Sequence, residues 1–155
     1  MPSREINAWI RLATILIVYV PYFAYVLELF RGSEAVGRPL CLAFVTAAFA
    51  HGVIAGVAEA IAQIVQGKAP VDERDRAIEA LSLRVAYFAL ISLVMTAFGC
   101  IALVGAISKP SAAGTILLPG FSATSQFVFF CFVCAEALRH AVQLFCYRRA
   151  VWSTA

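Results

Sequence analysis

The candidate residues for chemistry are ionisable and polar side chains that interrupt long apolar segments of this 155-residue chain. Glu59 stands in such a segment, where a charge is costly enough to mark a functional hypothesis. His51 and Gln63 fall on the same side of a helix as Glu59, because helical residues four and eight apart share a face. A second set has the spacing i, i+3, i+4 and i+7, and it comprises Glu136, Arg139, His140 and Gln143.

These two polar sets support two interpretations. An ion pair between Glu59 and Arg139 would join the second and fourth helices, and Glu136 would pair with Arg139 or His140 within its own helix. Such a clamp fixes the register of the helices, whereas the functional alternative is a proton or cation site. We favour the clamp, because buried ion pairs often serve register.

The five cysteines include Cys131 and Cys134, whose C-x-x-C spacing occurs in redox and metal sites. Both lie near the middle of an apolar segment, where a thiol does not ionise readily. A zinc site also needs four ligands, so we interpret these cysteines as packing residues. His51 likewise has no second ligand nearby in sequence. We expect no metal and no cofactor, and the lack of a nucleotide-binding loop or an assignable Ser-His-Asp set favours a non-enzymatic protein.

The densest charge cluster lies between residues 68 and 84. Its acidic and basic side chains nearly cancel, unlike a polybasic segment that binds anionic lipid. Asp72, with Asp75 three residues later, predicts a helix start near Glu73. The cluster is either a solvated helix start or a docking surface for a cytosolic partner, and the sequence leaves both open. The residues of the docking hypothesis are Asp72, Glu73, Arg74, Asp75, Arg76 and Glu79.

The segments that must position these residues are apolar enough to cross a membrane. The chain is 63% hydrophobic and 14% charged, whereas a soluble domain has about a quarter of its residues charged. Four stretches approach or exceed the roughly 20 apolar residues that a spanning helix needs. A soluble bundle would need a polar stripe on each helix, which 85–108 lacks. We predict an all-α, four-helix transmembrane bundle, a single domain over 1–155, with spans at 8–29, 40–66, 81–107 and 116–147.

Positive charge predicts the orientation of the bundle. Eight lysines and arginines flank one side of the predicted spans and three flank the other, with Arg139 left out because it lies within a span. The positive-inside rule places the richer side, both termini and the 68–84 loop in the cytoplasm. The net charge of +3 is therefore interpreted as topological and not as a sign of nucleic-acid binding. The first apolar segment lacks a clear cleavage site and is expected to be a retained anchor.

Two further patterns concern packing. The string Ala58-Glu59-Ala60-Ile61 is echoed by Ala135-Glu136-Ala137-Leu138, which suggests two repeated helical hairpins of parallel orientation. Gly52 and Gly56, with small residues four positions before and after them, form a ridge that lets another helix approach closely. That helix belongs either to the same chain or to a second copy in a homo-oligomer.

The charged loop also carries a resemblance. The string Asp72-Glu73-Arg74-Asp75-Arg76-Ala77-Ile78-Glu79, followed by Arg84-Val85-Ala86-Tyr87, resembles a family of small prokaryotic integral membrane proteins. Its members share an Asp-Glu-Arg-Asp-x-x-Ile-Glu loop before the third of four spans. The resemblance implies this architecture and a bacterial inner membrane, and it suggests an association with small helix-turn-helix regulators. It implies no chemistry.

Three functions follow from these observations, in order of preference. The first is a non-enzymatic multi-pass membrane protein that presents its 68–84 loop to a cytosolic, regulatory partner. The second is a small proton- or cation-coupled transporter that uses Glu59 and the polar face of the fourth helix. The third is a membrane redox enzyme that uses the cysteines.

Overall fold

The computed structural model describes residues 3–31, 37–66, 72–107 and 117–152, with side chains for 5–31, 39–65, 72–99 and 124–149. All described residues except Asp72 are helical. They form α1 (Ser3–Arg31), α2 (Gly37–Gln66), α3 (Glu73–Ile107) and α4 (Leu117–Trp152). Each helix is long and apolar enough to span a membrane. The predicted all-α, four-helix transmembrane architecture is confirmed, and the chain is a multi-pass membrane protein.

The helices extend beyond the predicted spans at the ends that carry charge. α1 begins at Ser3, five residues before its predicted span, α3 begins at Glu73 and α4 continues to Trp152. The 35 residues of α3 are about 52 Å long, against roughly 30 Å of hydrocarbon. Hydropathy marks only the part inside the bilayer, because a helix continues into water wherever its residues favour helix and its ends are capped.

The predicted start of α3 near Glu73 is also confirmed. The Asp72 carboxylate accepts a hydrogen bond from the Glu73 backbone N–H at 2.7 Å, and the Asp72 carbonyl accepts one from the Arg76 N–H at 3.2 Å. These bonds satisfy backbone groups that a helix start leaves open. The charged segment is therefore a defined helical turn.

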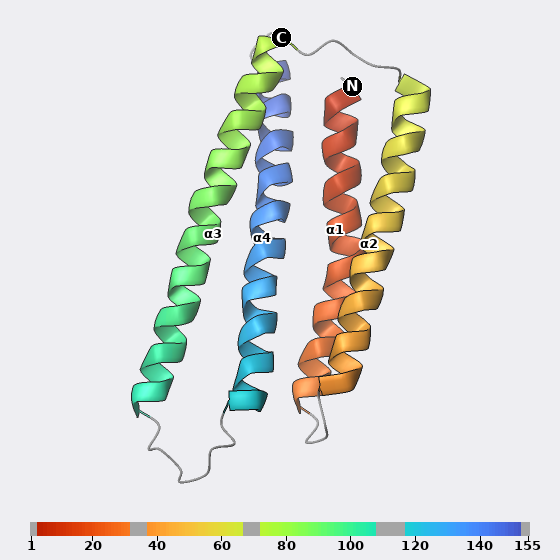
Figure 1. Cartoon of the computed structure of the whole chain (residues 1–155). Coiled ribbons are helices and arrows are strands. Elements are labelled where there is room, and N and C mark those ends of the chain that lie inside the picture. The colour runs from red at the N-terminus through yellow and green to blue at the C-terminus, as the bar shows by residue number, and fades with distance from the viewer. Residues whose placement is uncertain (1–2, 32–36, 67–71, 108–116, 153–155) are drawn as a thin grey trace.

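The helices lie in the spatial order α3, α4, α1, α2 (Figure 1). Extensive packing joins α1 to α2, α1 to α4 and α3 to α4. The two predicted hairpins are thus formed. They pack against each other through α1 of the first hairpin and α4 of the second. We call the end at which α1 and α3 begin, and α2 and α4 end, the charged end.

The core cluster between α1, α2 and α4 is apolar and aromatic. Val18, Tyr22 and Val26 of α1 are buried against Leu40 and Ala47 of α2. Phe129 of α4 joins this cluster through ring contacts to both helices.

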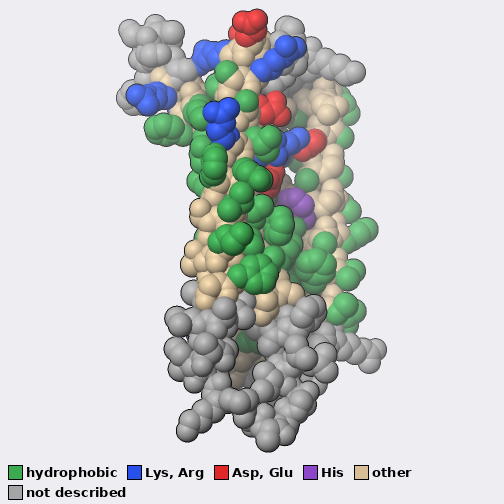
Figure 2. All heavy atoms as spheres, turned by 60° about the vertical axis from the view of Figure 1, so that its left-hand side comes forward, with side chains coloured by type: hydrophobic (Ala, Val, Ile, Leu, Met, Phe, Trp, Pro, Cys, Tyr) green, Lys and Arg blue, Asp and Glu red, His purple; other side chains and the backbone are tan. Residues whose placement is uncertain are grey.

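The outer surface of the bundle carries many exposed large hydrophobic side chains. Phe49 is 74% exposed and Ile64 is 83% exposed. In the view of Figure 2, hydrophobic side chains cover the middle of the bundle, while the Lys, Arg, Asp and Glu side chains gather toward the charged end. This distribution suits a protein whose middle is solvated by lipid and whose charged end is in water.

Candidate functional site

The predicted ion pair between Glu59 and Arg139 is wrong, because Glu59 has a different partner. The Glu59 carboxylate lies 2.8 Å from Nε of Arg11, which joins α2 to α1. Both side chains are partly exposed, by 33% for Glu59 and 44% for Arg11. Since α2 packs mainly against α1 and not against α4, the polar side of α2 is turned toward Arg11.

Arg139 belongs to a separate cluster on α4, whose predicted common face is confirmed. Glu136 Oε1 lies 3.2 Å from Nη1 of Arg139 and 3.3 Å from Nε2 of His140. The other ring nitrogen of His140, Nδ1, lies 3.1 Å from Oε1 of Gln143. His140 is only 2% exposed. One carboxylate oxygen is therefore shared by two basic side chains, one of them fully enclosed.

This cluster reaches the neighbouring helix through Arg139. Its Nη2 lies 3.8 Å from the carboxylate of Glu79 on α3. On the next turn of α3, the fully buried Ser82 donates a hydrogen bond from its hydroxyl to the Glu79 carbonyl at 2.8 Å. The α4 cluster is thus connected to the charged start of α3.

A third polar contact joins α1 to α4, and the sequence analysis did not identify it. Glu5 is 4% exposed, and its carboxylate lies 3.8 Å from Nε of Arg148. The Arg148 guanidinium also lies 5.4 Å from the ring centroid of Trp9, within cation–π range. Nothing in the sequence indicated that Glu5 is enclosed by helix packing.

The ionisable groups of the Arg11–Glu59 pair and of the α4 cluster lie toward the charged end of the bundle, and we call them together the ionic layer. It comprises Arg11, Glu59, Glu79, Glu136, Arg139 and His140. From Arg11 to Arg31 is 20 residues, or about 30 Å, and from Pro39 to Glu59 is the same distance. Because this length is close to the hydrocarbon thickness, Arg11 and Glu59 lie toward one end of the apolar lengths of α1 and α2 and not in their middle.

The other two polar residues predicted to share a face of α2 with Glu59, which are His51 and Gln63, do not form one site with it. His51 lies two helical turns, about 12 Å, from Glu59 and packs on Tyr19 with ring centroids 5.1 Å apart. Its Nδ1 is buried without a hydrogen-bond partner among the described residues. Gln63 is exposed. The predicted polar stripe of α2 is therefore divided, and only Glu59 takes part in the ionic layer.

The glycine ridge of α2 does not pack within the chain, so that alternative is wrong for the described residues. A Cβ added at Gly52 or Gly56 would meet no atom within 4 Å, and the flanking Ala48 and Ala60 are exposed. α2 packs on α1 through a different side, which includes the buried Ala47.

The cysteines for which side chains are described carry no disulfide. Cys131 is fully buried at 1% exposure and Cys134 is partly buried, and both are free thiols. Among the described residues, no three side chains of His, Cys, Asp or Glu gather as a metal site would require. This supports the interpretation of Cys131 and Cys134 as packing residues.

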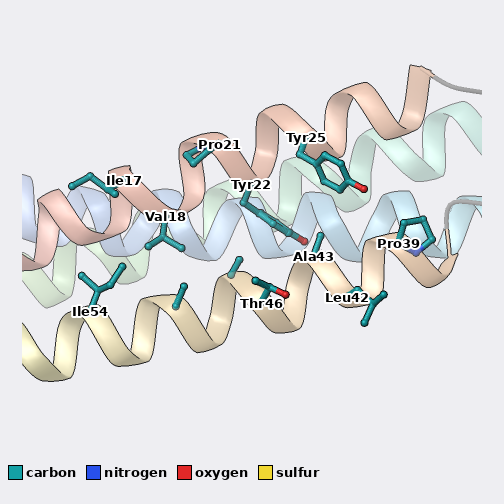
Figure 3. A pocket seen from close by; sticks show the side chains of 12 residues that line it. Ile17, Val18, Pro21, Tyr22, Tyr25, Pro39, Leu42, Ala43, Thr46 and Ile54 are labelled. Atoms are coloured by element: carbon teal, nitrogen blue, oxygen red, sulfur yellow. The ribbon is translucent and has the colours of Figure 1, made fainter.

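An apolar groove lies between α1 and α2 in the half of the bundle opposite the charged end (Figure 3). Its volume is about 600 Å³, and Pro21, Tyr22 and Thr46 contribute to its lining together with aliphatic side chains. The groove contains no ionisable acid or base of the ionic layer. It suits an apolar occupant and offers no arrangement for catalysis.

The residues of the docking hypothesis are placed at the start of α3. Asp72, Glu73, Arg74, Arg76 and Glu79 are exposed, and Asp75 is half-buried. Ile78 and Ser82 of the same helix are buried, which fixes the side of α3 that faces the bundle. The structure therefore places the predicted candidates in an ionic layer within the bundle and a charged surface beyond it, and Glu79 belongs to both.

Comparison of the chain with protein-family models, with curated proteins and with solved structures gave no match.

Proposed function

We propose that this protein is a non-enzymatic membrane protein that presents the charged start of α3 to a cytosolic protein partner. The observation that carries the proposal is that the side chains of Glu73, Arg74 and Arg76 are exposed and, among the described residues, make no ion pair. These three charges do not help to hold the bundle together, so they are available to a partner outside it.

The presentation of these charges supports docking in preference to a merely solvated loop. Residues 73–84 extend about 18 Å beyond the apolar stretch that begins at Val85. The segment is helical from Glu73 and is capped by Asp72. Its side that carries the buried Ile78 and Ser82 faces the bundle, where α3 packs mainly on α4. A partner would therefore meet a preformed charge pattern and would not have to order a flexible loop, which lowers the entropic cost of binding.

The orientation is part of the same proposal. The excess of lysine and arginine at the charged end supports a cytoplasmic location for that end. The loop resemblance noted in the sequence favours a bacterial inner membrane and a regulatory partner. Transport by Glu59 together with α4 has less support, since Glu59 and Arg139 belong to different hairpins and different ion pairs. The enclosed thiols likewise give little support to a redox enzyme.

Photo-crosslinking in cells tests the proposal directly. A photoreactive amino acid replaces Arg74 or Arg76 in the full chain, or Glu28 as the matched control at the opposite end. All three positions are exposed and lie on helices. We expect the same cytosolic protein to be captured at both α3 positions and not at Glu28.

A second pair of variants separates specific docking from proximity. Glu73→Lys should abolish capture by the photoreactive residue at position 76, because it reverses an exposed charge of the docking surface. Glu28→Lys should preserve capture, because it reverses an exposed charge at the opposite end of the bundle. Capture that is absent, that is equal at Glu28 or that is insensitive to Glu73→Lys would refute the docking function.

A further inference from the structure

The apolar groove between α1 and α2 runs along the helices and opens on the outer surface of the bundle (Figure 3). Pro39 lies at one end of the groove and Ile54 at the other, which is 15 residues or about 22 Å along α2. Two of its lining residues, Ile17 of α1 and Leu42 of α2, are 67% and 61% exposed. Because both helices span the membrane, the medium that meets this opening is lipid.

Small side chains of α2 create the hollow. Ala43, Ala47 and Ala50 recur at helical spacing on the side of α2 that lines the groove, where larger side chains would fill the space between the helices. A volume of about 600 Å³ over about 22 Å of length corresponds to a width of roughly 5 Å. An α-helix with its side chains is about 10 Å wide, whereas carbon atoms of hydrocarbon chains pack at about 4 Å. The groove is therefore too narrow for a helix of a second copy and suits one extended hydrocarbon chain.

The polarity of the lining changes along the groove. Its side chains include three hydroxyl groups, and that of Tyr22 is bonded to Gln126. The hydroxyls of Tyr25 and Thr46 make no hydrogen bond with other described residues. Both lie between the middle of the groove and its Pro39 end, and toward the other end the lining is aliphatic (Figure 3). An ester-linked lipid has the same order, because its carbonyl oxygens accept hydrogen bonds at one end and hydrocarbon follows.

The length of the groove indicates the length of the chain that fits it. Three bonds of an extended chain span about 3.6 Å, so a groove of about 22 Å holds a chain of about 18 carbons. Each carbon that contacts the walls adds a small dispersion energy, and these contributions sum along the chain. A shorter chain leaves part of the groove without contacts and should be held less well.

We propose that this groove binds one long acyl chain of a glycerophospholipid from the leaflet opposite the charged end, with an ester carbonyl at the hydroxyls of Tyr25 and Thr46. The ion pair of Arg11 with Glu59 joins α1 to α2 at the charged end. The bound chain fills the space between the same two helices in the other half of the bundle. The site is independent of the proposed docking function, because none of its lining residues belongs to α3.

Photolabelling of the full chain in nanodiscs tests the site. The probe is a phosphatidylethanolamine whose acyl chain of about 18 carbons carries a diazirine near its end. Ile54 lines the groove, and Val53 beside it is exposed outside the groove at the same depth, so the two residues are 41% and 47% exposed. We expect label at Ile54 to exceed label at Val53 several-fold. A diazirine near the ester should move the label toward Pro39.

Variants of α2 separate the groove from the general lipid surface. Ala50→Phe should abolish the excess of label at Ile54, because it fills the middle of the groove. Ala48→Phe is the matched control, since it enlarges an exposed alanine outside the groove and should leave the excess unchanged. Tyr25→Phe combined with Thr46→Val should reduce the excess by removing both donors. This double variant keeps the shape of the lining, so it remains informative if Ala50→Phe does not fold.

Equal labelling of Ile54 and Val53 would show contact with bulk lipid only and would overturn the proposal. An excess that Ala50→Phe and Ala48→Phe reduce equally would do the same. An unlabelled long-chain lipid should compete for the site better than a short-chain lipid, and equal competition would contradict the match of lengths. A groove that stays unlabelled in a chain that native mass spectrometry shows to be dimeric would assign it to a second copy. None of these outcomes depends on capture of a protein at α3, so the two proposals can fail separately.

Discussion

Arg11 of α1 and Glu59 of α2 form an ion pair, with Nε and the carboxylate oxygen 2.8 Å apart. The pair joins the two helices of the first hairpin at the boundary of their apolar stretches. Its counterpart in the second hairpin is the weaker contact of Arg139 with Glu79, at 3.8 Å. Each hairpin is thus fastened at the charged end by its own arginine and glutamate, and no described ion pair joins α2 to α4.

The first prediction concerns this ion pair. Glu59→Gln and Arg11→Gln should each lower the free energy of unfolding by up to about 1 kcal/mol, since both side chains are partly exposed. The charge exchange Arg11→Glu with Glu59→Arg should recover part of the loss. Unfolding in mixed micelles measures these values, with Glu28→Gln as a control at an exposed position. An exchange variant less stable than both single variants would argue against the pair.

The second prediction concerns Tyr22, which is 5% exposed and donates a hydrogen bond to Gln126 Oε1 at 2.5 Å. Tyr22→Phe should destabilise the protein by about 1 kcal/mol, because the bond between α1 and α4 is lost and the amide oxygen of Gln126 loses its donor. Tyr25→Phe, on an exposed tyrosine of the same helix, should change the stability little. Equal effects of the two changes on thermal unfolding would show that the hydrogen bond contributes nothing.

The third prediction compares two adjacent alanines of α2. Ala47 is 9% exposed and belongs to the core with α1, whereas Ala48 is exposed. Ala47→Leu should cost about 1–3 kcal/mol through overpacking, and Ala48→Leu should cost little. Thermal unfolding of both variants in micelles checks the rotation of α2 about its axis. The reverse ranking would mean that the glycine ridge, and not Ala47, faces α1.

The fourth prediction concerns orientation. In a chain without its own cysteines, Arg76→Cys should react with a membrane-impermeant maleimide only after the cells are permeabilised. Glu28→Cys, near the opposite end of α1, should react in intact cells. Both native side chains are exposed, so reactivity reports sidedness and not burial. The opposite labelling pattern would place the charged end outside and exclude a cytosolic partner for α3.

Some features of this protein are determined by its sequence alone. The four helices and the membrane assignment follow from hydropathy and length, which are properties of each segment by itself. The start of α3 was predictable too, because Asp72 caps its own helix through neighbouring backbone groups. The shared face of Glu136, Arg139 and His140 is likewise set by helical spacing.

Only the tertiary structure decided which residues meet across helices. Glu59 could face any neighbour, and it pairs with Arg11 because α2 is turned with its Ala47 side toward α1. The same rotation leaves Gly52 exposed, although its spacing suits close helix packing. The order of the helices and the rotation of each about its axis depend on the packing of all four together. Neither can be read from the hydropathy of one segment, because an all-apolar helix in lipid has no polar face to fix its rotation.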